Sequence, residues 1–113
     1  MPPKKNPLNL NPLQLRTLTL LQALAVLPDS KPGEAEGSVL LTSLPDPHGD
    51  HFHLGDAVVA AKDATGLRNP AVWAALERKG LIRPRLPEAV ILTPAGQDYD
   101  TGLRDAMLHR AGH

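Results

Sequence analysis

One histidine-rich segment is the part of this sequence that most resembles a metal-binding site. The run HGDHFH (48–53) holds three histidines, and Asp46 and Asp50 lie close to them. If the end of this run forms a strand, His51 and His53 share one face, as two metal ligands would. No cysteine or glutamate completes the set. We therefore predict exposed, mildly pH-sensitive histidines here, with no metal and no cofactor.

A group of basic side chains has a spacing that suits contact with phosphates. The alternative is a solvated face, balanced by Asp63, Glu77 and Glu88 nearby. The whole chain carries 12 basic and 12 acidic residues, so its net charge gives no support to nucleic-acid binding. The local clustering favours phosphate contact. The group consists of Arg68, Arg78, Lys79, Arg83 and Arg85, with Lys4 and Lys5 near the start of the chain.

The sequence offers no constellation for catalysis. It has no cysteine, which excludes disulfides, thiol chemistry and cysteine-bound zinc. It also has no glycine-rich phosphate loop and no serine with a base near it in sequence. The carboxylates of Asp98 and Asp100 fall on different sides of a predicted helix. We expect that the protein is not an enzyme.

Length and composition indicate one small globular domain. The chain has 113 residues, of which 42% are hydrophobic and 21% charged. Phe52, Trp73 and Tyr99 are its only aromatics, so Leu, Val, Ile and Ala must build the core. No apolar run approaches the roughly 18 residues of a membrane span. The opening MPPKKNPLNLNP lacks the apolar centre of a secretory signal. We expect a soluble cytoplasmic protein.

The first predicted element is a helix that follows a flexible arm over residues 1–10. Asn11 suits the N-cap, Pro12 suits the first helical position, and Gln14 completes a capping box. Pro28 ends the pattern. The residues expected to face the core recur at helical spacing: Leu15, Leu18, Leu21, Leu24 and Ala25.

The middle of the chain reads as a loop, a hairpin and a short helix. Residues 28–37 are polar and rich in breakers, which predicts a loop. The segments 38–44 and 51–54 read as paired strands, with PDPHGD as their turn. A helix is expected over 57–64, begun at Asp56. The alternative is that its two valines continue a strand.

The C-terminal half has clearer signals. Asn69 and Pro70 repeat the cap-then-proline pair, AVWAALERK follows, and Gly80 is placed to end that helix. Strands are expected from Ile82 and over 89–92, with LPE between them as the turn. Thr93 and Pro94 then begin a last helix. Its stripe is Tyr99, Leu103 and Met107, which we expect to pack on the first helix in part and to form the seam of a homodimer.

Two runs in this half resemble the winged-helix regulators of the MarR and PadR type. They are LERKGLI (76–82) and ILTPAGQDY (91–99), separated by a proline-bearing hairpin. The opening NPLQLRTLTLLQALA also looks like the first helix of those proteins. The resemblance covers about residues 10–105. It implies an α+β, mostly helical winged helix-turn-helix over residues 11–113, with a three-helix core, a small antiparallel β-hairpin wing and a C-terminal helix.

The resemblance also implies which helix would meet DNA. The helix ending at Gly80 would be the recognition helix, inserted in the major groove. Trp73 would belong to its inward stripe, with Asn69, Val72, Leu76 and Gly80. Its outer face would then be Ala71, Ala74, Ala75 and Arg78, and alanine offers only a methyl contact to thymine. The wing RPRLPE lacks the aspartate of the Asp-x-Arg motif common in MarR-type wings.

The sequence thus leaves two functions open. The first is a small transcriptional regulator that binds duplex DNA as a homodimer. The second is a winged-helix module for protein–protein contact without sequence-specific DNA binding, in which the alanine face packs on a partner helix. The candidate DNA-binding residues are Arg68, Ala71, Ala74, Ala75, Arg78, Lys79, Arg83 and Arg85.

Overall fold

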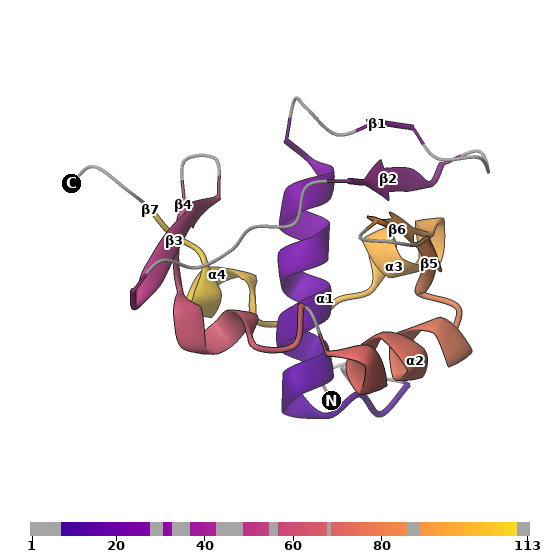
Figure 1. Cartoon of the computed structure of the whole chain (residues 1–113), viewed down its shortest axis with the longest axis horizontal. Coiled ribbons are helices and arrows are strands. Elements are labelled where there is room, and N and C mark those ends of the chain that lie inside the picture. The colour runs from indigo at the N-terminus through magenta and orange to yellow at the C-terminus, as the bar shows by residue number, and fades with distance from the viewer. Residues whose placement is uncertain are drawn as a thin grey trace, which may run out of the picture.

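The chain folds into an α+β arrangement in which antiparallel strands form two sheets on either side of one helix (Figure 1). The computed structural model describes residues 8–27, 31–32, 37–42, 49–54, 57–67, 69–85 and 89–110. No helix in these ranges is long and apolar enough to cross a membrane. The elements are α1 (Pro12–Ala25), β1 (Lys31–Pro32), β2 (Val39–Leu41), β3 (His51–Leu54), β4 (Ala57–Ala60), the 3-10 helix η1 (Ala61–Ala64), α2 (Pro70–Arg78), β5 (Ile82–Arg85), β6 (Ala89–Leu92), α3 (Pro94–Asp98), α4 (Arg104–Met107) and β7 (His109–Arg110).

Helix α1 begins as its capping signals predict. The Asn11 side chain accepts a hydrogen bond from the Gln14 backbone N–H at 2.8 Å. The Gln14 side chain accepts one from the Asn11 backbone N–H at 3.0 Å. This reciprocal pair satisfies two amides that the first turn leaves without helical partners. The capping box is confirmed, and the helix ends at Ala25, before Pro28 is reached.

The residues just before α1 pack on the domain. Leu10 is only 3% exposed. The Leu8 backbone N–H donates to the Tyr99 hydroxyl at 3.0 Å. Residues 1–7 of the predicted arm, including Lys4 and Lys5, lie outside the described residues.

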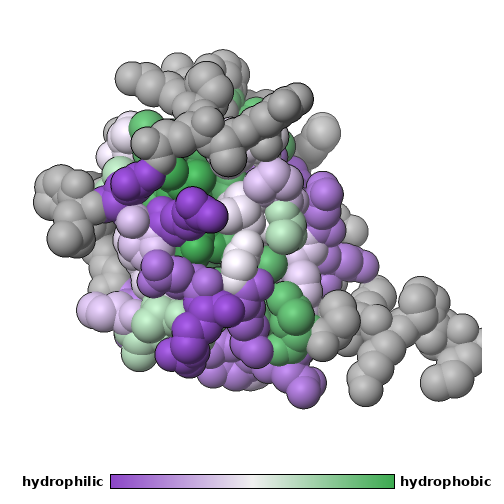
Figure 2. Space-filling view, turned by 90° about the vertical axis from the view of Figure 1, so that its right-hand side faces the viewer, coloured by the Kyte–Doolittle hydropathy of each residue, from purple (hydrophilic) through white to green (hydrophobic). Residues whose placement is uncertain are grey.

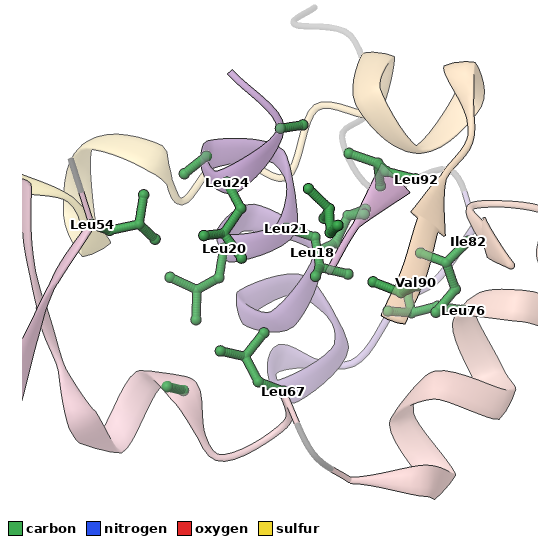
Figure 3. Close-up of a cluster of buried hydrophobic side chains, with 14 of the residues drawn as sticks. Leu18, Leu20, Leu21, Leu24, Leu54, Leu67, Leu76, Ile82, Val90 and Leu92 are labelled. Atoms are coloured by element: carbon green, nitrogen blue, oxygen red, sulfur yellow. The ribbon is translucent and has the colours of Figure 1, made fainter. Parts of the chain in front are cut away.

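Helix α1 is buried on most of its circumference. Its Leu18 and Leu21 side chains point toward β6, whereas Leu20 and Leu24 point toward Leu54 of β3 (Figure 3). Thr17 and Thr19 are fully buried as well, and their hydroxyls donate to the carbonyls four residues earlier, at 2.9 and 2.8 Å. The prediction of a single inward stripe was too narrow, because elements pack on two sides of the helix and leave little of it for solvent.

The first sheet has the order β1-β2-β6-β5. Part of the predicted strand over 38–44 is observed, as β2, and residues 43–44 lie outside the described residues. The predicted pairing of this strand with residues 51–54 is wrong. Strand β2 pairs instead with β6, where Leu41 lies opposite Val90, and both side chains are buried. Strand β1 pairs with the other edge of β2, so two residues of the predicted 28–37 loop are strand. This pairing is decided by the burial of β2 beside α1. It is not decided by the residues of the predicted turn PDPHGD.

The second sheet has the order β3-β4-β7. The strand over 51–54 is confirmed, with Phe52 and Leu54 buried. The predicted helix over 57–64 is wrong in its first half, because residues 57–60 form β4 and only the short η1 follows. The alternative reading, in which the valines continue a strand, is the one observed. Val59 is fully buried opposite Phe52, a setting that favours a β-branched side chain.

The predicted last helix is broken, so its continuous stripe of Tyr99, Leu103 and Met107 is wrong. Gly102 has φ +72°, outside the helical region. The Asp100 carboxylate accepts from the Gly102 N–H at 3.0 Å, a local bond that competes with helix formation. Met107 is 3% exposed, buried within its own chain. The homodimer itself stays a prediction.

Burial on the second side of α1 is testable at Leu20, which lies off the predicted stripe. We expect Leu20→Ala to lower the free energy of unfolding by about 2–5 kcal/mol, because it leaves a cavity in a fully buried position. Urea unfolding followed by circular dichroism measures this loss. Val26→Ala is the control, since Val26 is 68% exposed and should change stability by less than about 0.5 kcal/mol. Equal, small effects of both changes would refute the two-sided packing.

Candidate nucleic-acid interface

Helix α2 is placed by the signals that the sequence carries at both of its ends. The Asn69 side chain accepts from the Ala71 N–H at 3.0 Å, and Pro70 occupies the first helical position. Gly80 has φ +77°, the left-handed conformation expected just past a helix. The Trp73 indole N–H donates to the Leu67 carbonyl at 2.8 Å, and its ring packs against the core, as predicted. Arg68 lies outside the described residues.

The outer face of α2 differs from the predicted one at a single position. Ala71, Ala74 and Arg78 are exposed along one stripe, as expected. Ala75 is 5% exposed, so its assignment to the outer face is wrong. Helix α2 packs against both α1 and β5, and two neighbours bury a wider arc than the stripe of Val72 and Leu76.

A junction around Thr93 joins α2 to the strands and helix that follow. The Thr93 hydroxyl lies 2.7 Å from the Gly80 carbonyl oxygen and accepts a hydrogen bond from the Gly96 N–H at 3.1 Å. The Thr93 backbone N–H donates to the Leu81 carbonyl at 3.1 Å. One residue therefore satisfies a carbonyl just past α2 and caps α3. The two sequence runs that carry the winged-helix resemblance meet at this point.

Gly96 allows the parts of this junction to approach closely. It is buried, and a Cβ built on it would collide with the Leu81 carbonyl oxygen. Any larger residue would push α3 away from the start of β5. The Gln22 side chain of α1 donates to the Gly96 and Tyr99 carbonyls at 2.8 and 2.7 Å. The glycine in LTPAG is thus required by packing, and α1 satisfies carbonyls at the end of α3.

Strand β5 leaves the junction with alternating side chains. Ile82 is 1% exposed and faces the core, whereas Arg83 and Arg85 are exposed and share the other face. Pro84 is tolerated here because β5 lies at the edge of its sheet. The two arginines are consequently held on one side of a strand that the Thr93 junction fixes against the end of α2.

Four exposed cations lie at the end of α2 and along β5. We call them the basic surface: Arg78, Lys79, Arg83 and Arg85. Glu77 is the one carboxylate within residues 77–85, so four cations against one anion leave a local charge of +3. Figure 2 views this side of the molecule and shows strongly hydrophilic residues beside a patch of hydrophobic surface. The local charge is positive although the whole chain is neutral.

A groove of about 700 Å³ runs beside the basic surface. Ile91, which pairs with Arg83 across the two strands and is 4% exposed, forms part of its apolar floor. Arg83 and Arg85 on the lining can contact phosphates, and Glu77 is the one anion of the lining. Its lining comprises Ser38, Glu77, Gly80, Ile82, Arg83, Pro84, Arg85, Ile91, Thr93, Pro94 and Ala95.

Sequence reasoning found the arginines but missed the groove. Ser38 reaches it only because β2 pairs with β6, a contact between segments about fifty residues apart. Thr93 was assigned a capping role only, although its hydroxyl also meets Gly80. The sequence did carry a signal for the groove, because the two runs that resemble winged-helix regulators, 76–82 and 91–99, both border it.

The histidine segment lies in the other sheet, on the opposite side of α1 from the groove (Figure 1). His51 and His53 are exposed on β3, as predicted, and His48 lies outside the described residues. Within the described ranges, no three His, Cys, Asp or Glu side chains gather closely enough to hold a metal ion.

Comparison with known proteins returns no match: no family model, curated protein or solved structure is significantly similar to this chain.

The junction can be tested by removing one hydroxyl. We expect Thr93→Val to lower the free energy of unfolding by about 1–2 kcal/mol, because it removes the cap of α3 and the bond to Gly80. Thr93→Ser keeps the hydroxyl and should lose less than half as much. Thermal and urea unfolding provide the measurement. If the valine variant is as stable as the wild type, the hydroxyl does not hold the junction.

Proposed function

We propose that this chain is a winged-helix-like domain that binds duplex DNA, mainly through the phosphates. The observation that carries the proposal is the basic surface, which joins the end of α2 to one face of β5. In this proposal α2 lies against the major groove, and the β5–β6 hairpin acts as the wing that contacts the backbone. A cytoplasmic location, as the sequence predicts, fits this role.

The order of elements supports a winged-helix-like arrangement. A first helix is followed by a strand, a later helix and a hairpin, and the strand after the first helix pairs with the return strand of that hairpin. One part differs from the arrangement expected by resemblance. The hairpin β3–β4 and η1 precede α2, where a second helix of a helix-turn-helix is expected. The proposal therefore rests on α2 and the β5–β6 hairpin.

The exposed face of α2 determines what kind of binding to expect. Ala71 and Ala74 have no hydrogen-bond donors or acceptors in their side chains, so they read little beyond a thymine methyl. Arg78 is the one residue on this stripe that can pair with guanine. Phosphate contacts fix position without reading sequence. We accordingly infer a protein whose affinity is largely independent of DNA sequence.

The dependence of DNA affinity on salt concentration tests the proposal quantitatively. If all four cations of the basic surface contact phosphates, the logarithm of the binding constant should fall with the logarithm of salt concentration at a slope of about −3.6. Affinity would then drop by about 150-fold between 50 and 200 mM salt. Fluorescence anisotropy with a labelled random-sequence duplex measures the slope.

Charge reversal on β5 tests the location of binding. We expect Arg83→Glu with Arg85→Glu to weaken binding at least tenfold at 50 mM salt and to reduce the slope to about −1.8, because two of four phosphate contacts are lost. The control reverses the same amount of charge elsewhere: Lys62→Glu in η1 with Arg104→Glu in α4, both exposed. Equal losses in both double variants, or no binding of the wild type at 50 mM salt, would disprove the proposal.

A protein partner is the second candidate, and the alanines on α2 are the observation that favours it. Small exposed residues let another helix approach closely, and zero net charge suits protein contact. Ala74→Arg separates the two functions. We expect it to tighten duplex binding several-fold, because it adds a cation to the DNA-facing stripe. If Ala74→Arg leaves duplex affinity unchanged or weaker, and instead abolishes capture of a protein partner, the second function is correct.

A further inference from the structure

We propose that His51 and His53 form a binding site for a divalent late transition metal such as Zn²⁺ or Cu²⁺, oriented by Asp50. The site lies on β3, away from the basic surface, and is independent of the DNA-binding function. The sequence alone predicts exposed histidines without a metal, whereas the arrangement of the two rings favours a metal site.

The spacing of the two imidazoles matches that of two ligands on one metal. Alternation along β3 places both side chains on the exposed face, while Phe52 between them is buried. The ring centroids lie 5.5 Å apart, with planes inclined by 76°. With Zn–N bonds of about 2.0–2.1 Å and tetrahedral angles, the centroids of two ligating imidazoles are about 5–5.5 Å apart. The centroid separation of His51 and His53 is therefore compatible with two ligands of one ion.

Asp50 selects which nitrogen of His51 is available. Its carboxylate lies 3.0 Å from the Nδ1 of His51. An ionised carboxylate only accepts hydrogen bonds, so the Nδ1 carries a proton and donates it. In the neutral imidazole the lone pair is then on Nε2, as in the carboxylate–histidine–metal arrangement.

The site has two protein ligands, and water would complete the coordination sphere. No third His, Cys, Asp or Glu among the described residues converges with this pair. Affinity should therefore follow the order expected for simple nitrogen sites, with Cu²⁺ bound more tightly than Zn²⁺. A transition metal is favoured over Mg²⁺ or Ca²⁺, because imidazole nitrogen is a poor ligand for the latter.

Titration with Zn²⁺ alone, followed by imidazole nitrogen NMR shifts, tests the site. We expect saturable shifts of His51 and His53 at one ion per chain, with Nε2 of His51 as the bound atom. His51→Ala and His53→Ala should each weaken binding at least tenfold. Asp50→Asn should weaken it about tenfold, as loss of an orienting partner does. All three positions are exposed, so circular dichroism should show unchanged folding.

His109→Ala provides the matched control. The backbone register places residue 109 of β7 beside Val58, which in turn pairs with His53, so β7 is two strand spacings from β3. This variant should bind Zn²⁺ as the wild type does. If no saturable shift of His51 and His53 occurs below 1 mM Zn²⁺, roughly the weakest affinity of metal-binding modules, the proposal is wrong. It is equally wrong if His109→Ala reduces binding as much as His53→Ala.

Discussion

The structure depends on the enclosure of α1 between two sheets. A helix with one apolar stripe could support one layer, but this helix buries Leu18 and Leu21 toward one sheet and Leu20 and Leu24 toward the other (Figure 3). The buried hydroxyls of Thr17 and Thr19 donate to carbonyls of the same helix, so these two polar side chains are buried with their hydrogen bonds made. Because α1 separates the two sheets, their outer faces point in different directions and can serve unrelated purposes.

On one side of α1, a single junction determines what the surface can bind. Thr93 ties Gly80 at the end of α2 to the start of α3, and Gly96 lets Leu81 come close enough for this to happen. The consequence is that β5 begins directly beside the end of α2. Arg83 and Arg85 therefore extend the charge of Arg78 and Lys79, and a neutral chain presents a local charge of +3. The proposed DNA contact follows from this geometry more than from composition.

Local signals in the sequence predicted the helix starts and the last hairpin well. Asn11 with Gln14, Asn69 with Pro70, and Thr93 with Pro94 each specify a cap through bonds within a few residues, and all three hold. Contacts between segments that lie far apart in the sequence were not predictable in the same way. The pairing of β2 with β6, the burial of Leu20 and the burial of Ala75 depend on which elements pack together. The break after α3 depends on Asp100 and Gly102, whose local bond outweighs a regular apolar spacing.

The most direct test of DNA binding through the basic surface is to map where a short duplex touches the protein. Backbone amide shifts recorded during titration with a random-sequence duplex at 50 mM salt would locate the contact residue by residue. Binding through the basic surface predicts that the largest changes lie in residues 77–85, around the end of α2 and β5, and that β3 and β4 on the other side of α1 are unaffected. Changes centred on β3 and β4, or none at any duplex concentration, would contradict it.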